Sequence, residues 1–327
     1  MTADPVSDLV AGIADGDRRA LARGITLVES TRPDHREQAA RLVSNLLERT
    51  GGAVRLGISG PPGVGKSTFI EAFGRLLTSQ GHQVAVLAVD PTSSRSGGSI
   101  LGDKTRMEEL AKDPAAFVRP SPSGRALGGV TRSTREALLL CEAAGFDVVL
   151  VETVGVGQSE VAVADLTDLF VLLASPTGGD DLQGIKRGIM ELADIVVVTK
   201  ADGDLAAKAA HAAADIRRAL LLLRPRHEAL TPVTLEASAV DGTGVEEVWA
   251  AVAEAHAALQ ADGTLDRLRA EQARDWLWSE LRGALELLVR TDPGVAAALP
   301  EVEAAVGDGE LSPAAGAARL LEHLDLS

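Results

Sequence analysis

The eight residues GPPGVGKS, Gly60 to Ser67, follow the pattern G-x-x-x-x-G-K-S/T without a departure. An apolar run, VRLGIS, precedes them, and a stretch with helical spacing, STFIEAFGRLLTSQG, follows. In that context the glycines let backbone N–H groups surround phosphates, while Lys66 reaches the terminal phosphates and the Ser67 hydroxyl meets Mg²⁺. The segment therefore predicts a P-loop that binds a nucleoside triphosphate.

Further apolar runs follow the P-loop and alternate with amphipathic segments: QVAVLAVD, FDVVLVET, DLFVLLA, DIVVVTK and VTLEAS. Continuous runs of Val, Ile and Leu are typical of parallel strands that are covered by helices on both faces. We expect an α/β fold, with a three-layer P-loop NTPase domain and a mostly parallel central sheet over residues 53–258.

Helical spacing dominates both ends of the chain, so we expect an N-terminal helical extension over residues 1–52 and a C-terminal helical segment over residues 259–327. The C-terminal segment carries an apolar stripe at helical spacing: Trp276, Leu277, Leu281, Leu285 and Leu288. Such a stripe is usually core, but in a terminal segment it can also be buried against a second copy. We therefore predict that residues 259–327 form a homodimer.

The composition limits the partners. The 327-residue chain has a formal net charge of −15 and only 2% aromatic residues, which argues against nucleic acid or an anionic membrane as the main partner. It has no run of about 18 apolar residues, and acids occupy the N-terminus where a secretory signal needs a basic start. We expect a cytoplasmic protein that binds neither nucleic acid nor a membrane. The single cysteine, Cys141, is expected to be a small buried apolar residue.

Acidic residues end two of the predicted strands. Asp90 and Glu152 fall at the carboxyl edge of the sheet, where open α/β sheets bind ligands. Glu152 is suited to hold the water shell of Mg²⁺, and Asp90 to bind the metal or its waters. Asp103 begins a predicted helix, which it can cap, or it can approach Mg²⁺ from a mobile loop. Gly155 lets a backbone N–H approach the terminal phosphate.

Two later segments indicate the base. VVVTKADG places Thr199, Lys200 and Asp202 in the positions of the guanine-binding consensus N-K-x-D. Asp202 can accept hydrogen bonds from N1–H and N2–H₂ of guanine, whereas adenine has no such pair of donors, so the segment argues for GTP. Thr199 replaces the consensus Asn, which puts the additional tie made by that Asn in question. In SAVDGTG, Ser238 and Ala239 follow the last predicted strand, where a backbone group can contact the guanine oxygen.

The predicted nucleotide site comprises the P-loop, the glycine after Glu152 and the two base-binding segments: Gly60, Pro61, Pro62, Gly63, Val64, Gly65, Lys66, Ser67, Thr68, Gly155, Thr199, Lys200, Asp202, Ser238, Ala239 and Val240. The predicted catalytic residues are Lys66, Glu152 and Asp90, and the predicted Mg²⁺ site is made of Ser67, Asp90, Asp103 and Glu152. Water would attack the γ-phosphate of GTP. Val156 stands where a water-orienting Gln is expected, and Gln158 lies two residues later.

The segments GPPGVGKST, VDPTSSRSGGSILGDKTRM and VETVGVGQSE closely resemble the MeaB/ArgK family of P-loop GTPases, which has the human methylmalonic aciduria type A protein as a relative. The similarity spans the whole chain. The resemblance implies a homodimeric, GTP-hydrolysing metallochaperone with Mg²⁺ and GTP or GDP as ligands and no tightly bound organic cofactor of its own. It would gate the loading of adenosylcobalamin into methylmalonyl-CoA mutase, and it would protect or reactivate that enzyme.

The same resemblance assigns a meaning to SPTGGDDLQGIKRG, which by composition reads equally well as an ordinary strand-to-helix connection. In the family the matching loop is a third switch toward the mutase, so Asp180, Gln183 and Lys186 become candidate partner-coupling residues. The cobalamin adenosyltransferase is a further candidate partner.

Alternatives stay open at this point. The chain could serve another cobalamin-dependent acyl-CoA mutase, insert nickel, act as an ATP-dependent kinase, or bind nucleotide as a scaffold without turnover. One cysteine and six scattered histidines disfavour a nickel site, and Asp202 disfavours ATP. Measured turnover of GTP and ATP, with and without the mutase, separates the remaining readings.

Overall fold

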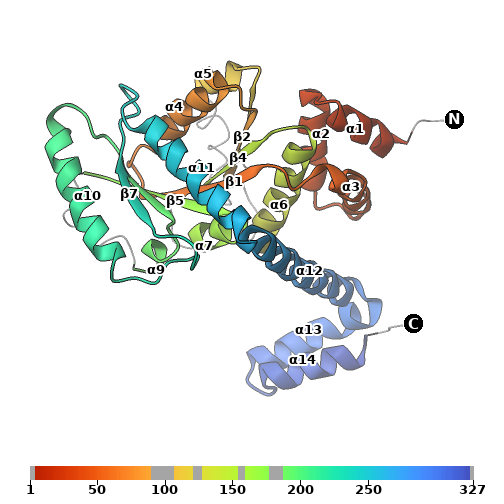
Figure 1. Ribbon diagram of the computed structural model, residues 1–327. Helices are drawn as coiled ribbons and strands as arrows, with labels where there is room; N and C mark the ends of the chain where they lie inside the picture. The colour runs from red at the N-terminus through yellow and green to blue at the C-terminus, as the bar shows by residue number, and fades with distance from the viewer. Residues whose placement is uncertain (1–3, 90–106, 121–126, 154–158, 177–186, 325–327) are drawn as a thin grey trace. The chain divides into compact units, whose positions relative to one another are not determined.

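The computed structural model describes residues 4–89, 107–120, 127–153, 159–176 and 187–324 of the chain (Figure 1). Asp90, Asp103, Gly155, Val156, Gln158, Asp180, Gln183 and Lys186 lie outside these residues. The chain divides into two compact units, Met1–Leu268 and Arg269–Ser327.

The first unit is built on a parallel sheet, which has seven strands in the described residues, in the order β3-β2-β4-β1-β5-β6-β7. The strands are β1 (Val54–Ser59), β2 (Val84–Val89), β3 (Ala116–Arg119), β4 (Val148–Thr153), β5 (Leu169–Ala174), β6 (Ile195–Val198) and β7 (Val233–Glu236). Every residue of β2, β4 and β5 is buried, as expected for a parallel sheet with both faces covered. The predicted α/β fold is confirmed.

One strand was not predicted. The edge strand β3 is only four residues long, and its second half is half-buried, so it carries no long apolar run. It pairs with β2 from Val84 opposite Ala116 to Leu87 opposite Arg119. The sheet thus extends one strand further beside β2 than the sequence pattern indicated.

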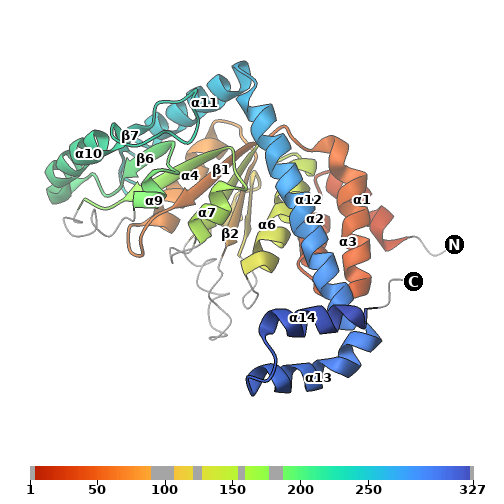
Figure 2. The same cartoon turned by 90° about the horizontal axis from the view of Figure 1, so that it is seen from below.

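Helices cover both faces of this sheet (Figures 1 and 2). One apolar layer joins α4 (Lys66–Ser79), α5 (Glu108–Lys112) and α11 (Val245–Ala261) to one face. The other layer joins the opposite face to α6 (Leu127–Ala143), α7 (Ser159–Ala164), α9 (Arg187–Met190) and α10 (Ala206–Leu220). Short 3₁₀ turns lie at Leu47–Arg49 and Gly203–Leu205.

The N-terminal helices α1 (Pro5–Ala14), α2 (Arg18–Val28) and α3 (Pro33–Leu46) pack on α6 (Figure 2). Asp4 and Asp17 cap the first two of these helices by accepting hydrogen bonds from backbone N–H groups. Cys141, on α6, is fully buried in the same apolar layer, as predicted. Burial in these surroundings raises the pKa of its thiol.

A buried ion pair fastens this helical layer to the sheet. The Arg55 guanidinium on β1 donates to the Glu142 carboxylate on α6 at 2.7 and 3.0 Å, and the Gly51 N–H donates to the same carboxylate at 2.6 Å. Both side chains are about as buried as the apolar core around them. Glu142 therefore connects α6, β1 and the segment that leaves the N-terminal helices.

The second unit contains most of α12 (Thr264–Thr291), together with α13 (Pro293–Gly307) and α14 (Pro313–Glu322). Asp292 and Ser312 cap α13 and α14 by accepting hydrogen bonds from Val295 N–H and Ala315 N–H. On α12, part of the predicted apolar stripe is solvent-exposed: Leu277, Leu281, Leu285 and Leu288, with Trp278 beside them.

None of the helices in the described residues is both long and apolar enough to span a bilayer.

We predict that Glu142→Ala lowers the free energy of unfolding by about 3–5 kcal/mol, because it leaves the Arg55 guanidinium buried without its carboxylate. A urea titration followed by circular dichroism measures the loss. The double variant Arg55→Met/Glu142→Leu should recover most of it, since no buried charge remains.

The matched control is Asp34→Ala, which breaks a solvent-exposed ion pair with Arg32 and should change the unfolding free energy little. If Glu142→Ala cost no more than this control, Glu142 would not be the connection described above.

Candidate nucleotide site

The P-loop joins the end of β1 to the start of α4, as the sequence predicted. Only glycine fits at its first position, because a Cβ on Gly60 would lie 2.6 Å from the carbonyl oxygen of Leu173. The Lys66 ammonium donates to the carbonyls of Gly60 at 2.6 Å and Pro61 at 3.2 Å. Since α4 begins at Lys66, the positive end of this helix faces the loop. The arrangement offers an anion a helix terminus and a nearby ammonium.

The end of β4 approaches the start of α4. Ser67 Oγ donates to Glu152 Oε1 at 3.3 Å, and Glu152 is buried although it is ionisable. A hydroxyl and a carboxylate at this place suit Mg²⁺, which prefers oxygen ligands and commonly takes only one or two of them from protein carboxylates. Within the described ranges, no three His, Cys, Asp or Glu side chains come together as a metal site. The other two predicted metal residues, Asp90 and Asp103, lie outside those ranges.

The segment after β6 is tied to the P-loop by two side chains. The Thr199 hydroxyl, which is buried, lies 2.7 Å from the Val64 carbonyl and 3.2 Å from that of Ala174. Lys200 Nζ donates to the Gly63 carbonyl at 2.8 Å. At the position where the consensus has Asn, Thr199 therefore makes its own hydrogen bond to the P-loop. Lys200 adopts a left-handed backbone conformation with φ of 56°, which is uncommon for a residue with a side chain.

Asp202 and Ser238 bring the two predicted base-binding segments together. The Ser238 hydroxyl donates to Asp202 Oδ2 at 2.6 Å, and it accepts from the N–H groups of Val240 at 3.3 Å and Asp241 at 3.4 Å. Ser238 is fully buried, whereas Val240 is largely exposed. The pKa of Asp241 is lowered, chiefly because its carboxylate accepts a hydrogen bond from the Thr243 backbone N–H at 3.0 Å. The hydrogen bond from Ser238 thus restrains one oxygen of the Asp202 carboxylate.

The described site residues thus form one constellation at the carboxyl edge of the sheet: the P-loop with Lys66 and Ser67, Glu152, Thr199 to Asp202, and Ser238 to Val240. Gly155 and the predicted coupling residues Asp180, Gln183 and Lys186 lie outside the described residues. Among the contacts that the sequence did not predict is a hydrogen bond of 2.7 Å between the hydroxyls of Ser59 and Thr153. The available signal was a polar residue closing each of two apolar strands.

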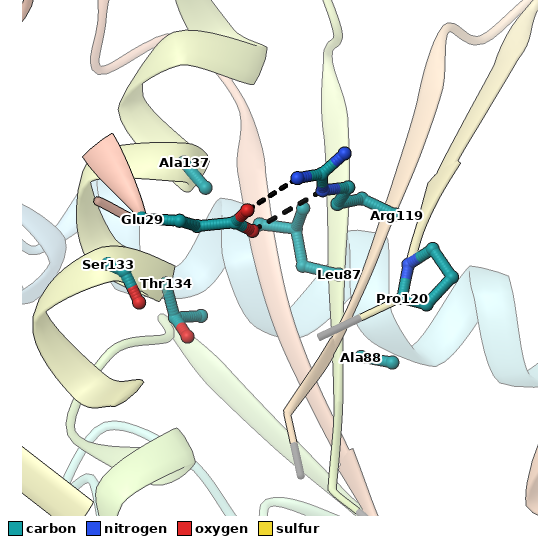
Figure 3. Close-up of a pocket in the computed structure, with 8 residues that line it drawn as sticks. All are labelled: Glu29, Leu87, Ala88, Arg119, Pro120, Ser133, Thr134 and Ala137. Carbon is teal, nitrogen blue, oxygen red and sulfur yellow. Dashed lines mark hydrogen bonds and ion pairs between the residues drawn. The ribbon is translucent and has the colours of Figure 1, made fainter. Parts of the chain in front are cut away.

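A separate pocket opens at the same sheet edge, at the ends of β2 and β3. Its lining is shown in Figure 3: Glu29, Leu87, Ala88, Arg119, Pro120, Ser133, Thr134 and Ala137. It holds about 260 Å³ of empty space, part of it open to solvent. The Arg119–Glu29 ion pair across it joins β3 to the end of α2.

Comparison with known proteins identifies relatives over nearly the whole chain. The family model of the methylmalonyl-CoA mutase-associated GTPase MeaB matches residues 21–293. A Caulobacter vibrioides protein is 54% identical over 321 residues, covering 98% of both chains. The mouse methylmalonic aciduria type A homolog, a mitochondrial protein, is 49% identical over 327 residues, covering 97% of this chain and 79% of the mouse protein.

A solved structure described as a LAO/AO transport system kinase superposes with a TM-score of 0.76 at 37% identity, covering 98% of both chains. It supports the P-loop NTPase fold seen here. The resemblance noted in the sequence is therefore confirmed, and the chain belongs to the MeaB family of methylmalonyl-CoA mutase-associated GTPases.

Proposed function

We propose that this GTPase uses GTP hydrolysis to gate the loading of adenosylcobalamin into methylmalonyl-CoA mutase, and that it protects or reactivates that enzyme. The family description and the name of the mouse relative support the mutase as the partner. The observation that carries the GTPase part is the double tie of Thr199 and Lys200 to the carbonyls of Val64 and Gly63, because it couples the base-binding segment to the phosphate loop.

The chemistry at the site is attack of water on the γ-phosphate of GTP, which yields GDP and phosphate. Lys66 would move from the carbonyls of Gly60 and Pro61 to the terminal phosphates and offset their charge. Ser67 and Glu152 would hold Mg²⁺, with Asp90 and Asp103 as further predicted ligands. Bound Mg²⁺ would supply additional positive charge at the phosphates. Catalysis of this kind depends on positioning, so a partner that orders the site can raise the rate.

Asp202→Asn should raise the KM for GTP about 100-fold, because an amide cannot accept from both guanine donors and loses the charge-assisted bonds. Steady-state phosphate release with GTP and ATP measures the effect. The wild-type chain should turn over GTP far faster than ATP.

Asp204→Asn serves as the matched control, since Asp204 is an exposed acid two residues along the same segment and its variant should keep the wild-type KM. Faster turnover of ATP than of GTP by the wild-type chain would contradict the assignment of guanine as the bound base, and it would favour an ATP-dependent kinase.

The partner assignment is tested by GTP turnover with purified methylmalonyl-CoA mutase. We expect the mutase to stimulate hydrolysis, and we expect pull-downs with GDP and with a non-hydrolysable GTP analogue to recover different amounts of the mutase.

Alanine substitutions at Asp180, Gln183 and Lys186 should reduce the stimulation but leave basal turnover intact. Stimulation by a different acyl-CoA mutase alone would redirect the proposal to that enzyme, and absence of turnover in every condition would favour a scaffold. The cobalamin adenosyltransferase is tested in the same pull-down.

We also propose that residues 259–327 mediate a homodimer. The support is the α12 stripe, in which Leu277, Leu281 and Leu285 are 66%, 43% and 51% exposed. Exposed apolar side chains spaced along one helix are typical of a surface that binds another protein. The division at residues 52/53 and 258/259 and the cytoplasmic location remain predictions.

Leu281→Glu/Leu285→Glu should convert the dimer to a monomer, because association would bury two carboxylates in an apolar interface. Size-exclusion chromatography with light scattering measures the mass. Leu47→Glu, at an exposed leucine of the first unit, is the matched control and should remain dimeric. A monomeric wild-type chain would contradict the proposed homodimer.

A further inference from the structure

Two hydroxyls join the carboxyl ends of β1 and β4. Ser59 Oγ and Thr153 Oγ1 lie 2.7 Å apart, and these residues are 1% and 0% exposed. Each is the last residue of its strand. A buried hydroxyl is tolerated when it has a hydrogen-bond partner, and here each hydroxyl provides one for the other. The bond therefore fixes the two strand ends relative to each other at the point where the chain leaves the sheet.

The preceding residue of β4 makes a second connection, on the other face of the sheet. Successive side chains of a strand point to opposite faces. Glu152 therefore reaches Ser67 on α4, while Thr153 reaches Ser59. Ser59 immediately precedes the P-loop, and Ser67 ends it. Two consecutive residues of β4 thus hold the two ends of the phosphate-binding loop.

These two connections differ in their relation to the proposed metal site. Ser67 and Glu152 are the proposed Mg²⁺ residues, so a bound metal would act directly on the groups that form their hydrogen bond. Ser59 and Thr153 are neutral and buried, and neither belongs to the metal site, so their bond can persist in every nucleotide state. The Ser59–Thr153 bond can therefore keep the end of β4 aligned with the start of the P-loop while nucleotide and metal bind and leave.

We propose that Ser59 and Thr153 are positioning residues for the response to the γ-phosphate. Their bond sets where the chain leaves β4, and the segment that follows carries Gly155, the predicted γ-phosphate sensor. The strand register also places Val89, the residue before Asp90, beside Thr153. The role rests on the proposed GTPase function, and it concerns the discrimination between GTP and GDP at that same site.

The test compares the affinities for a fluorescent GDP and for a fluorescent non-hydrolysable GTP analogue at fixed Mg²⁺. In Ser59→Ala, Thr153→Val and the double variant, the ratio of GTP-analogue affinity to GDP affinity should fall by roughly 2- to 10-fold, the equivalent of one hydrogen bond. The affinity for GDP, which lacks the γ-phosphate, should stay within about twofold on the same argument. Thr153→Ser keeps both hydroxyls and should keep the wild-type ratio.

Thermal unfolding separates positioning from stability. Each single variant leaves one buried hydroxyl without its partner, whereas the double variant removes both, so the double variant should be closer to wild type in stability than the single variants are. Its affinity ratio should nevertheless stay low. Thr167→Val is the matched control. This fully buried threonine precedes β5, at the amino ends of the strands and away from the P-loop, so the substitution should leave the ratio unchanged.

A double variant with the wild-type ratio would overturn the positioning role, even if the single variants were less stable. A ratio that simply follows stability across all variants, Thr167→Val included, would overturn it as well. If the wild-type chain bound neither nucleotide, the proposed function would fail and this role with it. That outcome is recognised from the wild-type measurement alone.

Discussion

Parallel pairing of β1 with β4 on one side and β5 on the other controls the geometry of the nucleotide site. Strands that run the same way end at the same edge, so the segments that leave them emerge within side-chain reach of one another. The register sets Ile58 beside Glu152 and Ser59 beside Leu172. A slip of one residue would turn Glu152 to the face away from Ser67, because the side-chain period of a strand is two. The contact between Ser67 and Glu152 therefore depends on the register of the sheet.

The P-loop is held through its carbonyl groups. Lys66 bonds those of Gly60 and Pro61, Thr199 lies within hydrogen-bonding distance of Val64 O, and Lys200 bonds that of Gly63. Donors from three side chains thus occupy carbonyl acceptors of the loop, and the Val64 N–H donates to the Pro61 carbonyl at 3.3 Å. The contacts of Thr199 and Lys200 join the segment after β6 directly to the P-loop.

Local patterns predicted most of the fold but few of the connections within the site. β2, β4 and β5 could be found because each carries its own uninterrupted apolar run, and the P-loop because its glycines and lysine have a fixed spacing. β3 is too short to give such a signal. The hydroxyl ties could not be predicted, since Thr199 reaches Val64 across 135 positions and Ser59 reaches Thr153 across 94. A hydroxyl bonds any acceptor within reach, so only the folded chain selects its partner.

The burial of Cys141 has a practical consequence. It is the sole cysteine of the chain, it is fully buried, and its surroundings keep it in the thiol form. The thiolate is the reactive species, so electrophilic labels do not modify this residue in the folded protein. A spectroscopic probe can therefore be attached to a cysteine engineered at the surface without removing the native one. Conversely, the rate at which Cys141 itself is labelled would report how often the layer between α6 and the sheet opens.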